Sequence, residues 1–89
     1  MNRYYLAVDI GASSGRHILG RMENGKMKLR EIYRFSNGMK MVDGTLCWNL
    51  NGLFEEIKAG MRECKRLGIN PESMGIDTWA VDFVLLDKQ

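Results

Sequence analysis

The residues most clearly suited to binding or catalysis form a turn rich in glycine and serine at residues 11–15, Gly-Ala-Ser-Ser-Gly. A tight turn can aim successive backbone N–H groups into a concavity, and glycine lets the backbone approach an anion closely. The Ser13 and Ser14 hydroxyls add donors, and Arg16 adds a positive charge. Asp9, which ends the preceding apolar run, is placed to hold a hydrated Mg²⁺ beside phosphate groups. The turn therefore indicates a phosphate-binding loop.

This turn matches neither of the common phosphate-binding motifs. It lacks the Lys-Ser/Thr ending of a P-loop and the G-x-G-x-x-G spacing of a dinucleotide fold. A strand-like segment follows the turn, so no helix N-terminus is available for the phosphates. Glycine and serine are also common in ordinary hairpin turns, and a structural turn with an exposed acid stays open as the alternative.

A second group of polar and aromatic residues lies at 77–82, Asp-Thr-Trp-Ala-Val-Asp. Open sheets usually bind their ligands at strand ends of this kind. The indole of Trp79 beside the carboxylates of Asp77 and Asp82 suits a sugar, because the C–H face of a sugar stacks on the ring while its hydroxyls donate to the acids. The alternative is a tryptophan that fills the core, flanked by two solvated aspartates.

The other reactive side chains predict no further site. His17 is the only histidine, and Cys47 and Cys64 have no CxxC spacing, so we expect no zinc site. Two reduced thiols in a cytosolic protein are the simplest interpretation of the cysteines. We expect His17 to be a half-exposed structural residue of a strand rather than a base.

Length and composition exclude several classes of protein. The chain has 89 residues, of which 45% are hydrophobic and 27% charged, with a net charge of +2, as expected for one globular unit. No apolar window approaches the about 18 residues of a membrane helix, and no signal-peptide stretch precedes Asp9. The basic residues are dispersed except at Lys26, Lys28 and Arg30, which we interpret as the solvent-exposed face of a strand. We therefore expect a cytoplasmic protein without nucleic-acid or membrane partners.

Periodicity and turn signals predict the elements that position these residues. Alternating apolar residues predict a strand over 4–10 that is buried on both faces, followed by strands over 16–22 and 27–35 joined by Asn24-Gly25. A short hairpin around Asp43-Gly44 is expected to pair 39–42 with 45–48. These segments predict a three-strand antiparallel meander followed by a small hairpin.

An amphipathic helix of about four turns is predicted next. Its apolar stripe, which we expect to dock on the sheet, consists of Leu50, Phe54, Ile57, Met61 and Cys64. Asn49 or Asn51 can cap the first turn, with Glu55 and Glu56 near the positive end of the helix dipole. Gly68 supplies the left-handed residue after the helix, and Pro71 prevents its continuation.

Two further strands are predicted after the helix, a buried one over 73–77 and another over 82–87. Three antiparallel strands that feed a helix and then a parallel neighbour make an α/β plan, distinct from a doubly wound nucleotide fold. Because the last predicted strand runs almost to Gln89, we expect the chain to be part of a longer one.

Three segments, 7–16, 29–38 and 75–87, resemble the FGGY family of carbohydrate kinases, and the resemblance spans nearly all 89 residues. It implies a ribonuclease-H-like fold shared with actin and hexokinase. It further implies that residues 1–89 are the N-terminal part of the first kinase domain, without the remainder of that domain or the second domain.

The resemblance also implies a reaction, the Mg²⁺-dependent transfer of the ATP γ-phosphoryl group to the 1-hydroxyl of the ketose L-rhamnulose. It assigns Asp9 and Gly11 to organising phosphate and Mg²⁺, the metal being held by Asp9 through water. The residues that would contact ATP are Ala12, Ser13, Ser14, Gly15 and Arg16.

On the sugar side, the resemblance assigns Ala80, Trp79 and Asp82 to the substrate. Kinases of this kind carry glycine where Ala80 stands, so a methyl group is added at this contact. The general base of the family falls beyond position 89, and we expect the chain alone to be inactive. Two alternatives remain: a kinase of another ketose, and a small non-catalytic phosphate-binding or interaction module. We expect the exposed sheet edge of the fragment to favour self-association.

Overall fold

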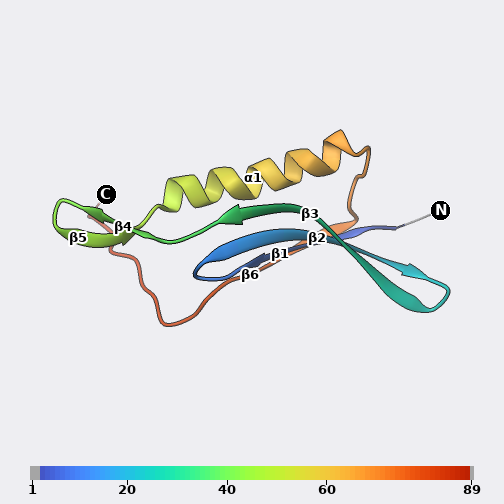
Figure 1. The fold of residues 1–89 in the computed structure, drawn as a ribbon, viewed down its shortest axis with the longest axis horizontal. Coiled ribbons are helices and arrows are strands. Elements are labelled where there is room, and N and C mark those ends of the chain that lie inside the picture. Colours follow the sequence, from blue (N-terminus) through green and yellow to red (C-terminus); the bar gives the residue numbers. More distant parts are fainter. Residues whose placement is uncertain (1–2, 89) are drawn as a thin grey trace.

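The computed structural model describes residues 3–88 and consists of a four-stranded sheet, a small hairpin and one helix (Figure 1). The elements are β1 (Tyr5–Ile10), β2 (Ser14–Glu23), β3 (Lys26–Ser36), β4 (Met39–Val42), β5 (Thr45–Trp48), α1 (Leu50–Arg66) and β6 (Ser73–Asp77). The helix lies along one face of the sheet, and the β4–β5 hairpin projects beyond one end of it (Figure 1).

The strand order β3-β2-β1-β6 confirms the predicted α/β plan. β1, β2 and β3 form an antiparallel meander, and α1 carries the chain across to β6, which pairs parallel with β1. The turn between β2 and β3 is the predicted Asn24-Gly25, in which both residues have positive φ, at 52° and 76°. This conformation matches the right-handed twist of the strands that it joins.

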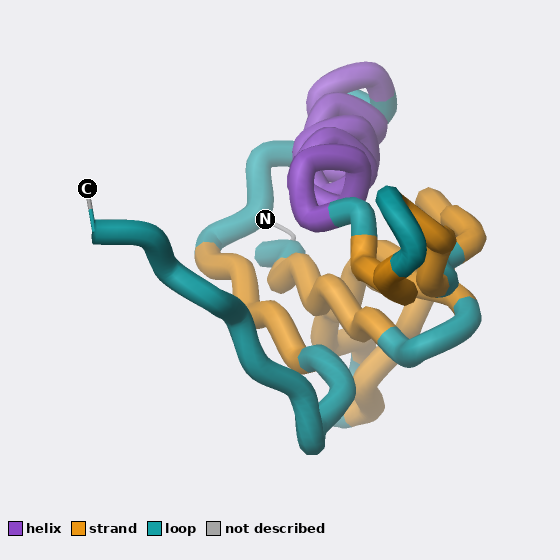
Figure 2. Tube along the Cα trace, turned by 90° about the vertical axis from the view of Figure 1, so that its left-hand side faces the viewer, coloured by secondary structure: helices purple, strands orange, loops and turns teal. Residues whose placement is uncertain are grey.

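The core lies between α1 and the face of the sheet that it covers. Its buried side chains are Leu6, Val8, Ile10, Leu19, Phe35 and Cys64. The prediction that residues 4–10 are buried on both faces is wrong, because Tyr5, Ala7 and Asp9 are exposed. Alternate residues of a strand point to opposite faces, and within the described residues the helix covers only one of them. Figure 2 shows this arrangement end-on, with the helix above the strands.

Both predicted ends of α1 are confirmed. The Asn49 side chain accepts a hydrogen bond from the Gly52 N–H at 3.0 Å, as an N-cap does. At the other end Gly68 has a φ of 75°, and the Ile69 N–H donates to the Cys64 carbonyl at 2.9 Å. This is a Schellman motif. The prediction that acidic residues lie near the positive end of the helix dipole is wrong, since the first turn that follows Asn49 holds none.

The predicted apolar stripe of α1 is only partly buried. Ile57 and Cys64 pack toward the sheet, but Leu50 and Phe54 are 62% and 59% exposed and Met61 is also exposed. The helix is rotated so that Ile57, Gly60 and Cys64 face the sheet, where Gly60 lies against His17. A glycine contact cannot be recognised from an apolar periodicity, which explains the difference.

The strand at 73–77 exists, but it is an edge strand whose five residues are all exposed, so its predicted burial is wrong. The strand predicted over 82–87 is absent from the described residues. A strand needs a neighbour for its N–H and C=O groups, and the chain leaves the sheet after Asp77 (Figure 2). Asp82 forms local bonds instead, accepting from the Trp79 indole at 3.0 Å and from the Phe83 N–H at 2.8 Å.

Among residues 3–88, no helix is long and apolar enough to cross a membrane. Lys26, Lys28 and Arg30 lie on the exposed first half of β3, as predicted for the solvent-exposed face of a strand.

Candidate functional site

The glycine–serine turn connects β1 to β2 at the carboxyl end of β1. A hydrogen bond of 2.8 Å from the Gly11 N–H to the Ser14 carbonyl closes the turn around Ala12 and Ser13, which are exposed at its tip. The N–H groups of these two tip residues form no hydrogen bond with another backbone group among the described residues. Two adjacent donors are therefore available to an anion, together with the exposed Ser13 hydroxyl.

Asn37, which the sequence analysis did not single out, fixes the shape of this loop. Its backbone N–H donates to the Ser13 carbonyl at 2.9 Å, and its side-chain Nδ2 donates to the Gly11 carbonyl at 2.9 Å. Asn37 follows directly after β3, whose last residue Ser36 is paired with Ser14. The loop is thus held at two carbonyls by a residue far away in the sequence, and these bonds do not use the N–H groups of Ala12 and Ser13.

Gly15 contributes to the position of the loop because it has no side chain. It is buried at the start of β2, where a Cβ would overlap the ring of Phe35, its partner on β3. Phe35 in turn belongs to the core. The close packing of Gly15 against this ring anchors the end of the loop to the hydrophobic core.

Asp9 and Arg16 are cross-strand partners on the face of the sheet opposite α1. The Arg16 Nε lies 3.8 Å from the Asp9 Oδ2, and Nε is buried without a hydrogen-bond partner among the described residues. The strand registers extend this pair into a row across all four strands, in the order Arg34, Arg16, Asp9, Asp77. The row therefore has two positive side chains, on β3 and β2, beside two carboxylates, on β1 and β6.

The donor set of this row fits a phosphate and a hydrated cation. The Asp9 side chain is 51% exposed and can accept from metal-bound water, while the partly exposed Arg16 side chain beside it supplies a positive charge for a phosphate. No group of three potential metal-ligating side chains occurs within residues 3–88. A Mg²⁺ ion here would hence keep several waters and take few protein ligands, as Mg²⁺ usually does beside phosphates.

The predicted sugar-side residues lie after β6. Trp79 is half-buried and donates its indole N–H to Asp82, so these two are brought together, whereas Ala80 is exposed beside them. Asp77 belongs to the charged row at the end of β6. The sequence analysis missed Trp48 at the end of β5, whose ring centroid lies 4.5 Å from that of Trp79. A contact between a hairpin and a distant loop leaves no local signal in the sequence.

His17 is fully buried rather than half-exposed as predicted. Its Nε2 donates to the Ile57 carbonyl of α1 at 3.0 Å, and the ring meets Tyr33 edge-on at 5.5 Å. Burial lowers the pKa of His17 below its ordinary 6.5, against the opposing effects of the Ile57 hydrogen bond and the Glu56 carboxylate. His17 is therefore a neutral residue that joins β2 to α1, and the prediction that it is structural holds.

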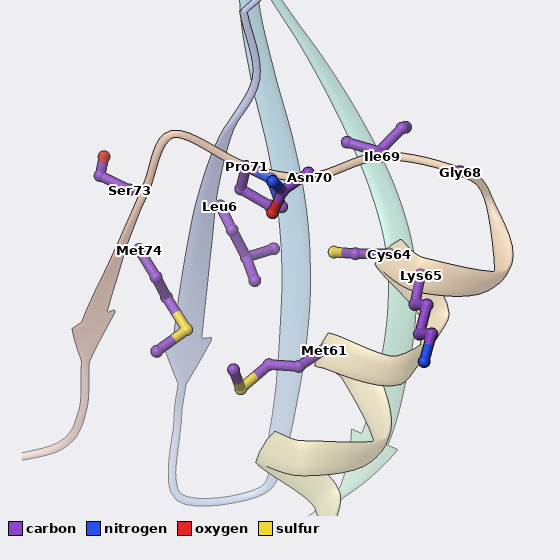
Figure 3. A pocket seen from close by; sticks show the side chains of 10 residues that line it. All are labelled: Leu6, Met61, Cys64, Lys65, Gly68, Ile69, Asn70, Pro71, Ser73 and Met74. Atoms are coloured by element: carbon purple, nitrogen blue, oxygen red, sulfur yellow. The ribbon is translucent and has the colours of Figure 1, made fainter.

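One hollow of the described residues lies away from the charged row. It is a groove of about 560 Å³ between the C-terminal turn of α1 and β6, and Figure 3 shows Leu6, Met61, Cys64 and Met74 facing it. Burial raises the pKa of the Cys64 thiol, which makes it a poor nucleophile. The lining includes the polar side chains of Lys65, Asn70 and Ser73 but no carboxylate, so the groove offers no counterpart of Asp9.

Comparison with known proteins finds relatives that match nearly the whole chain. A rhamnulokinase of Halalkalibacterium halodurans is 59% identical over 85 residues, and one of Bacillus subtilis is 46% identical, each match covering 96% of this chain. The chain matches rhamnulokinases. A rhamnulokinase of Oceanobacillus iheyensis matches 99% of the chain at 49% identity. The chain spans only about 18% of the length of the first relative. No family model matches the sequence.

A solved structure supports the fold independently of the rhamnulokinase sequences. The PPX-GPPA enzyme of Aquifex aeolicus superposes with a TM-score of 0.62 over 88% of this chain, at 11% identity, and the match covers 27% of that chain. At this identity the likeness concerns the fold alone, and it confirms the expected ribonuclease-H-like architecture.

Proposed function

We propose that this chain forms the N-terminal, phosphate-handling part of a cytoplasmic rhamnulokinase of the FGGY family, which transfers the γ-phosphoryl group of ATP to the 1-hydroxyl of L-rhamnulose. The observation that carries the proposal is the identity of 46–59% to rhamnulokinases over almost the whole chain. The anchored loop at 11–15 supports it, because its free donors and the Asp9–Arg16 pair suit a nucleotide phosphate. Residues 1–89 would be the first part of the first kinase domain.

The loop would bind ATP through Ala12, Ser13, Ser14, Gly15 and Arg16. Backbone N–H groups and hydroxyls fixed in advance stabilise negative charge on phosphate oxygens without rearranging during the reaction. Asp9, near the end of β1 and two residues before Gly11, would accept hydrogen bonds from metal-bound water and so orient it. A Mg²⁺ ion supplies neutralisation of the phosphate charge when it is bound.

The sugar would bind beside the segment after β6. Trp79, held by Asp82, offers carbon surface, and the exposed Ala80 lies next to it. The Ala80 methyl narrows this position relative to glycine but leaves the backbone N–H and C=O free to contact a hydroxyl.

No residue of the chain is assigned as the general base that must accept the proton of the sugar hydroxyl. The 89-residue chain is therefore expected to give no turnover with ATP and L-rhamnulose. A longer protein that contains it should phosphorylate L-rhamnulose in preference to a panel of other ketoses. Robust activity of the isolated chain, or a longer protein that favours another ketose, would overturn the proposal.

The role of the loop has its own test in the longer protein. Asp9→Asn keeps the size of the side chain but removes its charge, and kcat is expected to fall by about 100-fold or more, the range found for groups that organise reacting charge. Asp43→Asn makes the same change in the exposed β4–β5 turn, where a positive φ of 49° suits asparagine, and should leave activity unchanged. Equal effects of the two substitutions would contradict the assignment of Asp9.

A further inference from the structure

We propose that Trp48, together with Trp79, forms an apolar wall for the methyl end of the ketose and so favours a 6-deoxy sugar over its 6-hydroxy counterpart. The inference rests on the proposed function and adds a specificity residue to it. Its starting point is the indole pair, with ring centroids 4.5 Å apart and planes inclined by 40°. Rings at this inclination diverge from one edge, and both are only half-buried, so carbon surface stays open to a ligand.

The polar edge of Trp79 is already satisfied within the chain. Its indole N–H donates to the Asp82 Oδ2 at 3.0 Å, and the second oxygen of that carboxylate accepts the Phe83 N–H at 2.8 Å. Asp82 thereby fixes the orientation of the ring. A ligand that reaches Trp79 meets carbon atoms rather than a free donor, as an apolar group requires.

The position of Trp48 connects this wall to the phosphate loop. Trp48 ends β5, which is paired with β4, and β4 begins just after Asn37, the residue that holds the loop. Trp79 follows β6, whose last residue Asp77 is the register partner of Asp9. Both indoles therefore extend from the same end of the sheet as the phosphate-binding groups, as a sugar that accepts a phosphoryl group from the bound nucleotide would require.

The chemistry of the wall predicts which sugar it favours. A methyl group against indole carbon removes apolar surface from water, whereas a hydroxyl there would lose hydrogen bonds to water without replacement. Apolar pockets of this kind discriminate against one added hydroxyl by at most about 100-fold. L-Rhamnulose carries a methyl group at C6, and L-fructose is the same sugar with a hydroxyl there.

The test compares Trp48→Ala and Trp48→Phe in the longer protein with Phe54→Ala, a control that removes an exposed aromatic side chain from α1. Trp48→Ala is expected to raise KM for L-rhamnulose about 10-fold, to leave KM for ATP unchanged, and to lower the kcat/KM preference for L-rhamnulose over L-fructose about 10-fold. Trp48→Phe should retain most of this preference, and Phe54→Ala should match the wild type. Circular dichroism checks that each variant is folded.

A second readout separates this inference from the proposed function. Titration with L-rhamnulose in the absence of ATP should change the tryptophan fluorescence of the wild type, and Trp48→Ala should need about 10-fold more L-rhamnulose for its change. If the wild type phosphorylates L-rhamnulose but Trp48→Ala keeps the same KM and sugar preference, the role of Trp48 is overturned. If the wild type phosphorylates neither ketose, the proposed function fails, and the titration then decides the sugar site: a Trp48-dependent signal upholds it, and an unchanged signal overturns it.

Discussion

Gly60 of α1 lies directly against the imidazole of His17 on β2, and a Cβ at position 60 would overlap the Cδ2, Nε2 and Cε1 atoms of the ring. The same ring donates from Nε2 to the Ile57 carbonyl, one turn earlier in the helix. This contact sets the rotation of α1 on the sheet. Since His17 follows Arg16 directly, the helix, the core and the charged row at the loop are connected through adjacent residues.

The first prediction concerns Gly60→Ala. In an exposed helix this change adds about 1 kcal/mol of stability, but a methyl forced into a filled space typically costs about 1–3 kcal/mol. Because the added Cβ would overlap a buried ring, we expect a net loss in the free energy of unfolding, measured by urea denaturation of the chain. In a His17→Ala background the same change should be neutral or stabilising. A stabilised single variant would show that His17 moves aside freely.

The second prediction concerns pH. The pKa of His17 is lowered by burial in the folded chain, so below its ordinary value of 6.5 the unfolded chain binds a proton that the folded chain does not. The contribution of neutral His17 to stability is thus complete above pH 6.5 and is lost as pH falls from there toward the depressed folded pKa.

Urea denaturation from pH about 7.5 to about 5.5 checks this, with His17→Gln as the control, since an amide can also donate to the Ile57 carbonyl but does not titrate in this range. The wild type should lose more stability than the control over this interval. Parallel profiles would show that another group is responsible.

The residues that were predicted correctly act through their own neighbours in the sequence. Asn24-Gly25, Asn49 and Gly68 each set a turn or a cap from local backbone conformation and hydrogen bonds. The strand order was also predicted correctly, because a meander, a helix and a further strand can be combined in only a few topologies.

The errors concern burial, which depends on elements distant in sequence. The predicted burial of β6 is wrong, and the far edge of this strand has no neighbour within the described residues. At the candidate site, the composition of the loop indicates phosphate binding, and this assignment stays a prediction. Asn37 and Trp48 were missed because their contacts with Gly11 and Trp79 depend on strand register and hairpin placement.

A third prediction tests the anchoring of the loop to the core. Gly15→Ala should destabilise the chain, because its Cβ would overlap the Phe35 ring. Overpacking of this kind costs about 1–3 kcal/mol. The double variant Gly15→Ala/Phe35→Leu removes the ring and should be more stable than Gly15→Ala alone, although Phe35→Leu by itself loses core packing. Urea denaturation measures the loss in the free energy of unfolding of each variant. If the loss in the double variant equals the sum of the losses in the two single variants, the two side chains do not compete for the same space.

The last prediction tests whether Asn37 acts on ATP binding through the loop. Asn37→Ala removes the Nδ2 donor to the Gly11 carbonyl and leaves the backbone bond to Ser13 intact. A hydrogen bond of this kind contributes about 0.5–1.5 kcal/mol, so in the longer protein KM for ATP should rise about 2-fold to 10-fold while KM for L-rhamnulose stays unchanged. Asn51→Ala, the same substitution at an exposed position in the first turn of α1, serves as the control. Because the loop is proposed to meet only the nucleotide, an equal rise in both KM values would mean that Asn37 supports the fold as a whole and not the phosphate site.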